Sequence, residues 1–252
     1  MTWRIEQGDC LELMAGLAAQ SVDAILTDLP YGTTACKWDV MIPFAPMWAA
    51  VRRVLKPRGA FVTTASQPFT SALVMSNPAW FRHCWTWEKD KAANFVTCNV
   101  RPLAVAEDII VFGNGSVNYY PQMHQLAKPD RRSFVGNQIK TQRHPTAPIA
   151  SPIPDEATYT HHYPRSVLRI SNSLRDKQHP TQKPVALYAY LIRTYTNEGD
   201  TVLDFCCGAG TTLVAAINTG RNSIGFDSDS TYCDVARKRC EQAEMQLRLP
   251  LL

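Results

Sequence analysis

Short apolar runs that alternate with helix-like stretches are the feature that most constrains the fold. Residues 22–27 (VDAILT) form an apolar run that is typical of a strand buried on both faces of a parallel sheet. Further strands are predicted at residues 3–6, 60–64, 83–88, 107–112, 201–205 and 222–226. Helices are predicted between them, at residues 10–18, 44–55, 68–76, 184–195, 211–218 and 230–246. Strands that alternate with helices imply right-handed crossovers, so we expect a doubly wound α/β fold with a mostly parallel sheet.

Composition places the chain among globular proteins. Its 252 residues suit one large domain or one domain with an insert, and 45% apolar against 19% charged residues is not a disordered composition. No apolar run approaches the roughly 18 residues of a membrane span, and the first residues resemble no secretory leader, so we expect a cytoplasmic protein without a membrane partner. The eight cysteines include no CxxC pair, which favours reduced thiols and predicts no metal site.

Positive charge is concentrated in one part of the chain. The whole sequence carries +4, but residues 121–180 contain nine Lys or Arg against four Asp or Glu, which is +5 for that segment. The segment is rich in proline and separates two regular halves of the chain. A basic insertion of this kind suits phosphate contacts, and we delimit it as residues 114–178. The alternative is a solvated surface loop region.

A glycine turn forms the first candidate site. Residues 202–212 (VLDFCCGAGTT) predict a strand, a tight turn at Gly208 and Gly210, and the start of a helix. Glycines let the backbone approach a ligand closely, and amides at a helix start favour an anion. Asp227 ends the next strand, where a carboxylate can accept hydrogen bonds from two ribose hydroxyls. The third glycine of the dinucleotide fingerprint is missing, so NAD is disfavoured and S-adenosylmethionine is favoured; the alternative is an ordinary turn followed by an unrelated acid.

A second candidate site follows the apolar run 22–27. It consists of Asp28, Leu29, Pro30 and Tyr31, at the carboxyl end of a predicted central strand, where open α/β sheets bind ligands. A carboxylate acceptor, a rigid proline and an aromatic ring suit a planar base that carries an amino group. As an isolated tetrapeptide, the same residues are more often a simple turn.

These two motifs, with HPTQKP at residues 179–184 between them, resemble the amino-group DNA methyltransferases in their permuted, β-class order. The resemblance implies a Rossmann-like methyltransferase fold with a seven-stranded sheet. It also implies one catalytic domain over residues 1–252, in which the basic insert 114–178 is the target-recognition region. The sequence departs from the family pattern in two places: Leu29 stands where Pro is usual, and Asp204-Phe205-Cys206 replaces Asp-Pro-Phe.

The resemblance also implies a site for S-adenosylmethionine. The implied cofactor-binding residues are Asp9, Cys10, His179, Lys183, Pro184, Phe205, Cys207, Gly208, Gly210, Thr211, Thr212 and Asp227. In this scheme Asp9 accepts from the adenine amino group, Asp227 holds the ribose, and Thr212 binds the carboxylate. Each residue also has a simpler explanation: Asp9 caps the helix that begins at residue 10, Lys183 is a surface lysine, and His179 packs in a turn.

The implied reaction is methyl transfer to an exocyclic amino nitrogen of a base flipped out of duplex DNA. The catalytic residues are then Asp28, Leu29, Pro30 and Tyr31. The Asp28 carboxylate and the Leu29 carbonyl accept the two amino hydrogens, and Tyr31 stacks on the base. Asp in the first position resembles adenine-N6 enzymes, and a carboxylate acceptor suits N6; the alternative is cytosine-N4.

The expected partners are double-stranded DNA and a second copy of the chain. The candidate DNA contacts are Lys37, Trp38, Arg131, Arg132, Lys140, Arg143 and Arg165. Trp38 has the alternative of a buried loop anchor. Other readings are a methyltransferase that acts on RNA or protein, and a DNA-binding module without catalytic activity.

Overall fold

The computed structural model describes residues 1–32, 39–133, 156–173 and 182–248. The chain divides into two compact units, one formed by Met1–Tyr120 with Ser166–Leu252 and the other by Pro121–Arg165. In the second unit, strands β6 (His124–Ser133) and β7 (Glu156–His162) pair in an antiparallel, two-stranded sheet. This unit falls within the sequence range of the predicted basic insert.

An eight-stranded sheet forms the centre of the larger unit. Its spatial order is β1 (Trp3–Gln7), β10 (Asn222–Asp227), β9 (Thr201–Asp204), β2 (Val22–Thr27), β3 (Leu55–Ala65), β5 (Ala104–Phe112), β4 (Phe81–Ala93) and β8 (Val167–Arg169). Within the described residues only β5 runs against the other strands of this sheet. The mostly parallel α/β fold is therefore confirmed. The additional strand relative to the expected seven is β8, which has only three residues and pairs with one edge of β4.

Helices cover both faces of the sheet. One face carries α1 (Cys10–Ala15), α2 (Phe44–Val54) and α3 (Phe69–Ser76), and the other carries α4 (Val185–Tyr195), α5 (Thr211–Asn218) and α6 (Ser230–Arg248). Successive side chains of a strand point to opposite faces. In β2, Ile25 accordingly packs with Trp48 of α2, while Leu26 packs with Leu187 and Ile192 of α4. This explains why the strand is apolar without alternation.

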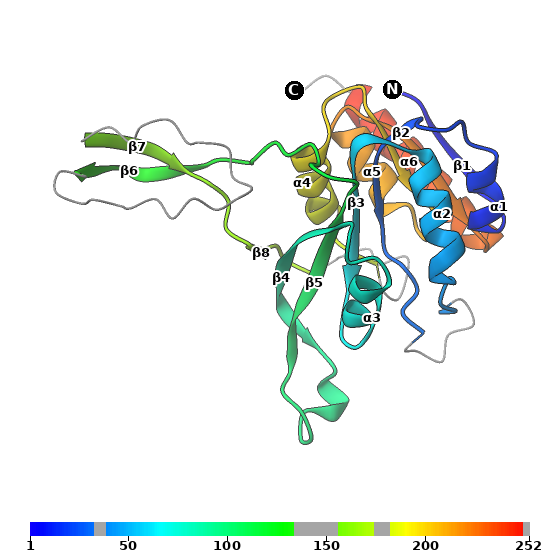
Figure 1. The fold of residues 1–252 in the computed structure, drawn as a ribbon, viewed down its shortest axis with the longest axis horizontal. Coiled ribbons are helices and arrows are strands. Elements are labelled where there is room, and N and C mark those ends of the chain that lie inside the picture. Colours follow the sequence, from blue (N-terminus) through cyan, green and yellow to red (C-terminus); the bar gives the residue numbers. More distant parts are fainter. Residues whose placement is uncertain (33–38, 134–155, 174–181, 249–252) are drawn as a thin grey trace. The chain divides into compact units, whose positions relative to one another are not determined.

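The order of the strands places a ligand site at the centre of the sheet, where β2 pairs with β3 (Figure 1). From β2 the sheet continues through β3 in one direction, and through β9, β10 and β1 in the other. Ligands of open α/β sheets bind at the carboxyl ends of the strands where the order reverses. The segments that follow β1, β10, β9 and β2 all meet at this edge.

Within the described ranges, none of the helices is both long enough and apolar enough to cross a membrane.

Candidate active site

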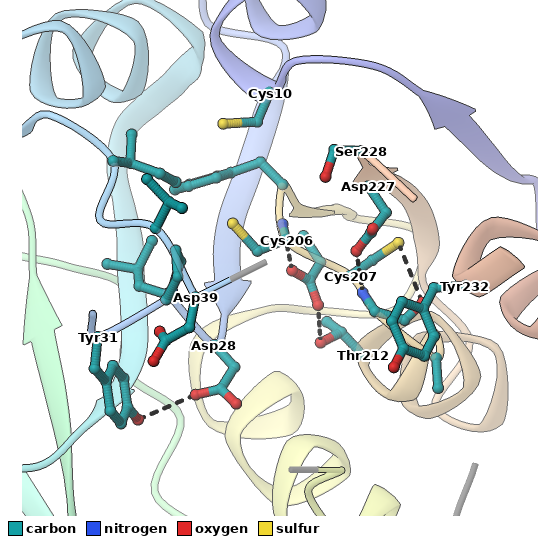
Figure 2. A pocket seen from close by; sticks show the side chains of 18 of the residues that line it. Cys10, Asp28, Tyr31, Asp39, Cys206, Cys207, Thr212, Asp227, Ser228 and Tyr232 are labelled. Carbon is teal, nitrogen blue, oxygen red and sulfur yellow. Dashed lines mark hydrogen bonds between the residues drawn. The ribbon is translucent and has the colours of Figure 1, made fainter. Parts of the chain in front are cut away.

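A cavity of about 450 Å³ opens at the carboxyl ends of the central strands. This size suits a small-molecule ligand, since such sites commonly measure about 300–1,000 Å³. Residues 28–31 and residues 204–209, 211 and 212 line the same cavity, together with residues 8–11, 39–43, 182, 183, 188, 227, 228 and 232. Figure 2 shows Asp28 and Tyr31 on one side of the cavity and Thr212, Asp227 and Tyr232 on the other.

The glycine turn after β9 is held by the carboxylate of Asp227. The Gly208 amide donates to Asp227 Oδ2 at 2.8 Å, and the Asp229 amide donates to Oδ1 at 2.9 Å. Gly208 has a φ of +47°, which favours glycine. Cys207 donates from its amide to the carbonyl of the adjacent strand β10, at Phe226. Strand, turn and acid thus form one unit whose surface faces the cavity.

Among the described residues of the implied cofactor set, two lie outside the cavity lining. Gly210 has a φ of +72°, and a Cβ added to it would lie 2.8 Å from the Cβ of Ala236, so this glycine permits close packing of α5 against α6. Pro184 is buried and precedes the first residue of α4, where its fixed φ suits a helix start. Both act on the helices that frame the site, and neither contacts the cavity.

Asp204 is a buried carboxylate in the cavity wall that the sequence analysis treated only as part of the turn. It is 4% exposed and accepts from the Thr212 hydroxyl at 2.5 Å and from the Cys206 amide at 3.1 Å. The Thr212 hydroxyl, expected to bind a ligand carboxylate, is therefore engaged by Asp204. Burial raises the pKa of Asp204 to about 7.

The start of α1 supplies another part of the cavity wall. Asp9 caps this helix, accepting from the amides of Leu11 at 2.8 Å and Glu12 at 3.1 Å, as its simpler explanation predicted. It also lines the cavity. The Cys206 thiol hydrogen-bonds to Cys10, which lowers the pKa of Cys10 and raises that of Cys206. Figure 2 shows both thiols at the cavity wall.

Asp28 lies at the centre of a hydrogen-bond network. Its Oδ2 accepts from the Lys183 ammonium at 2.7 Å. Its Oδ1 accepts from the hydroxyl of Thr64 in β3 and from the Tyr31 hydroxyl at 3.1 Å. The Asp28 side chain remains 25% exposed. Lys183 therefore contacts the proposed catalytic carboxylate, which favours a role in holding Asp28 over the predicted contact with the cofactor.

Glu107 of β5 forms the second layer of this network, and the sequence analysis did not identify it. Its Oε1 lies 3.0 Å from Lys183 Nζ and 3.0 Å from the Tyr31 hydroxyl, and its Oε2 lies 2.5 Å from Lys89 Nζ. Lys89 Nζ also lies 4.9 Å from the ring centroid of Trp87. Two carboxylates and two ammonium groups thus meet beside Tyr31 with no net charge.

The charges in this network stabilise one another. Burial alone would lower the pKa of Lys183, but the carboxylates of Asp28 and Glu107 outweigh burial and raise it. Burial alone would raise the pKa of Glu107, but the ammonium groups of Lys183 and Lys89 hold it below its usual value. Burial, with Asp28 and Glu107, raises the pKa of Tyr31 well above its usual value, so the Tyr31 hydroxyl stays a donor.

Tyr31 and Leu29 are fixed by packing. The Tyr31 ring stacks on Phe69, with centroids 5.0 Å apart and planes at 24°. The Leu29 side chain is 4% exposed and packs in the core, so leucine fills the position where the family has proline. Among the described contacts, the Leu29 carbonyl accepts no hydrogen bond.

The charge of the cavity selects between ligands. The described lining residues include the carboxylates of Asp9, Asp28, Asp39 and Asp227, the carboxyl group of Asp204, whose pKa is raised to about 7, and one ammonium group, of Lys183. A cleft lined by one sign of charge attracts the opposite sign. The lining therefore fits a cationic nucleoside such as S-adenosylmethionine, and disfavours a dinucleotide with two phosphates.

Several predicted site residues lie outside the described residues or are described only in part. Lys37, Trp38, Lys140, Arg143 and His179 lie outside the described residues. On either side of residues 33–38, the Gly32 amide donates to Asp39 Oδ1 at 2.8 Å.

The remaining basic candidates belong to the second unit. Arg131 and Arg132 are described only as backbone in β6. Arg165 is exposed at the end of the unit.

The cavity also has lining residues that no motif indicated. They are Val40, Met41, Ile42, Pro43, Tyr188, Ser228 and Tyr232. Tyr188 lies in the first turn of α4, which begins two residues after Lys183. In the part of the chain that the structure describes, no group of three or more His, Cys, Asp or Glu side chains is arranged to hold a metal ion.

Comparison with known proteins gives matches over nearly the whole chain. Residues 22–238 match the family model described as DNA methylase. The chain is 26% identical to the type II methyltransferase M.HpaI of Haemophilus parainfluenzae over an alignment of 254 residues. This alignment covers 96% of this chain and 75% of that protein.

Solved structures show the same fold. The crystal structure of the M1.HpyAVI–SAM complex superposes with a TM-score of 0.63 at 23% identity, over 94% of this chain and 100% of that chain. The cytosine-N4-specific PvuII DNA methyltransferase superposes with a TM-score of 0.67 at 18% identity, over 95% of this chain and 86% of that chain.

Proposed function

This chain belongs to the DNA methylase family of amino-group methyltransferases, and from that premise we propose that it methylates the N6 amino group of an adenine flipped out of duplex DNA. The methyl donor is S-adenosylmethionine. The observation that carries the proposal is that one cavity is lined both by residues 28–31 and by the glycine turn after β9. A bound donor and a bound base would therefore share one enclosure, which favours direct transfer.

The cofactor side of the cavity is supported by its chemistry. S-adenosylmethionine supplies an electrophilic methyl group on a positively charged sulfur. Asp227 and Asp9 place carboxylates on this side, together with the carboxyl group of Asp204, and Phe205 adds an apolar wall. The glycine turn lets the backbone approach the ligand closely.

The target side of the cavity is supported by the hydrogen-bonding capacity of Asp28. A carboxylate offers about four acceptor positions. Thr64 and Lys183 fill two of them, and Tyr31, whose single hydrogen is shared between Asp28 and Glu107, fills at most a third. At least one position therefore remains for an N–H of the target amino group. The Leu29 carbonyl accepts the second N–H. Together these bonds favour a pyramidal nitrogen with a localised lone pair, which is the nucleophilic form.

Adenine is proposed over cytosine because the first residue of the catalytic tetrapeptide is Asp28. Asp in this position resembles the adenine-N6 enzymes, whereas the hydrogen-bonding capacity of a carboxylate suits the amino group of either base. Cytosine-N4 is the second candidate, since the cytosine-specific PvuII enzyme has the same fold.

The DNA contacts and the oligomeric state are proposals as well. The basic insert, residues 114–178, would contact phosphates and bases through Arg131, Arg132, Lys140, Arg143 and Arg165, and residues 37 and 38 would contact the DNA strand beside the target. A homodimer is proposed from the family resemblance. Sedimentation velocity of the purified chain tests it directly.

Transfer of labelled methyl groups tests the proposed function. The purified protein is incubated with methyl-labelled S-adenosylmethionine and, separately, with duplex DNA, RNA and a protein mixture. The DNA is then digested to nucleosides for mass spectrometry. We expect N6-methyldeoxyadenosine in the duplex DNA alone. Detection of N4-methyldeoxycytidine instead would show that the target base is cytosine. Label confined to RNA or protein would refute a DNA substrate. Cofactor binding without any transfer would indicate an inactive binding module.

A further inference from the structure

Arg239 of α6 is a half-buried cation that the proposed chemistry does not use. Its guanidinium donates to the carbonyl of Ala209 and to Thr211 Oγ1, the latter at 3.4 Å. Ala209 and Thr211 both line the donor side of the cavity, whereas Arg239 is not among the lining residues. Arg239 therefore acts on the cavity through this part of its wall.

The sequence of α6 leaves Arg239 without an acidic neighbour on the helix. Arg237, two residues earlier, pairs with Asp234 at 2.7 Å. Around Arg239, the positions three and four residues away, which are the neighbours on a helix surface, hold Val235, Ala236, Gln242 and Ala243. Burial lowers the pKa of Arg239, and among the described residues no carboxylate opposes this effect. A half-buried charge without a counter-ion is costly, so its position here points to an anion that the folded chain does not itself supply.

The contact with Arg239 fixes one peptide of the glycine turn. The carbonyl of the peptide between Ala209 and Gly210 accepts from Arg239, and the amide of the same peptide donates to the Cys207 carbonyl at 2.7 Å. Gly210 has no side chain to restrict its backbone, so this peptide would rotate more freely with one tether than with two. The next amides, at the start of α5, have no acceptor within the helix. Their direction follows from this peptide, and they lie at the donor side of the cavity.

Arg239 also supplies a positive charge to the donor side of the cavity. The ammonium group that lines the cavity, of Lys183, pairs with Asp28 on the target side. Asp9 and Asp227 place carboxylates on the donor side. S-adenosylmethionine carries a carboxylate at its methionine end besides its positive sulfur, and the neighbouring carboxylates would repel that group. A cation at the start of α5 adds to the positive end of the helix dipole and favours a carboxylate there.

We propose that Arg239 is a positioning residue for the methyl donor. It holds the Ala209–Gly210 peptide so that the start of α5 receives the carboxylate of the donor, and its charge offsets that carboxylate. Arg239 acts through the turn and does not touch the target base, so it governs donor binding and not the transfer step. This inference rests on the proposed function, since it requires S-adenosylmethionine to sit on the glycine turn after β9.

Two ligands that differ at the methionine end test the proposal. S-adenosylhomocysteine has the carboxylate, whereas methylthioadenosine lacks the whole amino-acid part. Their Kd values are measured by isothermal titration for the parent, Arg239→Gln and Arg239→Lys. In Arg239→Gln we expect the Kd of S-adenosylhomocysteine to rise roughly tenfold, while that of methylthioadenosine stays within about twofold of the parent. Arg239→Lys keeps the charge, so both Kd values stay within about threefold of the parent.

Steady-state kinetics separate donor binding from transfer. With duplex DNA as substrate, Arg239→Gln raises the KM for S-adenosylmethionine roughly tenfold and leaves kcat at saturating donor within about twofold of the parent. Arg237→Gln is the matched control, because it removes from the same helix an ion pair with Asp234 and a hydrogen bond to the Ile5 carbonyl. It leaves KM, kcat and both Kd values unchanged.

Other outcomes overturn the inference in distinguishable ways. Parental affinity for S-adenosylhomocysteine in Arg239→Gln would exclude a role in donor binding. Equal weakening of both ligands, with a Tm below that of Arg237→Gln, would assign Arg239 to the packing of α6 and overturn the positioning role. A parent protein that binds S-adenosylmethionine but methylates no DNA would overturn the proposed function alone, because the comparison of Kd values needs no transfer. A parent that binds no S-adenosylmethionine would overturn both.

Discussion

Replacing Lys183 with methionine is the sharpest perturbation of the active site, because one ammonium group serves two carboxylates. Its Nζ lies 2.7 Å from Asp28 Oδ2 and 3.0 Å from Glu107 Oε1, and the Lys183 and Glu107 side chains are only 11% and 7% exposed. Removing one partner of a buried ion pair costs about 3–5 kcal/mol, since the other charge is left uncompensated. Asp28 is 25% exposed and Lys89 still pairs with Glu107, so we expect the lower end, about 3 kcal/mol.

Thermal and urea denaturation measure this loss. At about 2–4 °C per kcal/mol for a chain of this size, Lys183→Met lowers the Tm by about 6–12 °C. Lys183→Met/Glu107→Gln recovers at least half of the lost stability, because it removes a carboxylate together with its cation. Lys89→Met is the matched comparison, because it removes the other ammonium group from Glu107 without touching Asp28. It lowers stability but leaves kcat within about threefold of the parent. Lys183→Met, in contrast, lowers kcat by at least about tenfold. Parental stability and kcat in Lys183→Met would refute the role assigned to this network.

Three further predictions concern other parts of the fold. Burial raises the pKa of Asp204 to about 7, so the folded protein keeps a proton that the unfolded chain releases near pH 4. The contribution of Asp204 to the free energy of unfolding therefore falls by roughly 4 kcal/mol as the pH rises from about 4 to 7. Denaturation measured across this range will show a free energy of unfolding that changes less with pH in Asp204→Asn than in the parent. The same pH dependence in both proteins would contradict a raised pKa of Asp204. The hydrogen bond from Cys206 lowers the pKa of Cys10, so iodoacetamide labels Cys10 before Cys206, and S-adenosylmethionine slows the labelling of Cys10, as peptide mapping will show; equal labelling of these two thiols would count against it. Gly210→Ala lowers the free energy of unfolding by about 2–4 kcal/mol, because of its positive φ and its contact with α6. Gly199 also has a positive φ but open space around it, so Gly199→Ala lowers the free energy of unfolding by only about 1–2 kcal/mol. Similar losses in the two variants would show that packing against α6 is unimportant.

The sequence predicted the elements that local pattern determines. Apolar runs such as residues 22–27 indicated buried strands, and motif positions at strand ends placed Asp28 and Asp227 at the functional edge. Parallel strands put their carboxyl ends at one edge, so this inference needed no knowledge of long-range contacts.

Long-range pairing determined what the sequence did not predict. Glu107 reaches Lys183 and Tyr31 because β5 inserts between β3 and β4, and no local pattern reports that order. The same limit applies to β8, whose three residues are too few for a periodic signal. Gly210 matched a ligand-binding motif, yet it packs against α6, since only the folded arrangement shows what lies beside its missing Cβ.

The most direct measurement of the central claim separates donor binding from methyl transfer in Asp28→Ala. Isothermal titration with S-adenosylmethionine and transfer of labelled methyl groups to duplex DNA are recorded for the parent and for this variant. If Asp28 holds the target amino group beside a donor seated on the glycine turn, the variant binds the donor within about threefold of the parent and loses at least about a hundredfold in transfer. Parental transfer rates in the variant, or a loss of donor binding as large as the loss of transfer, would contradict that division of the cavity.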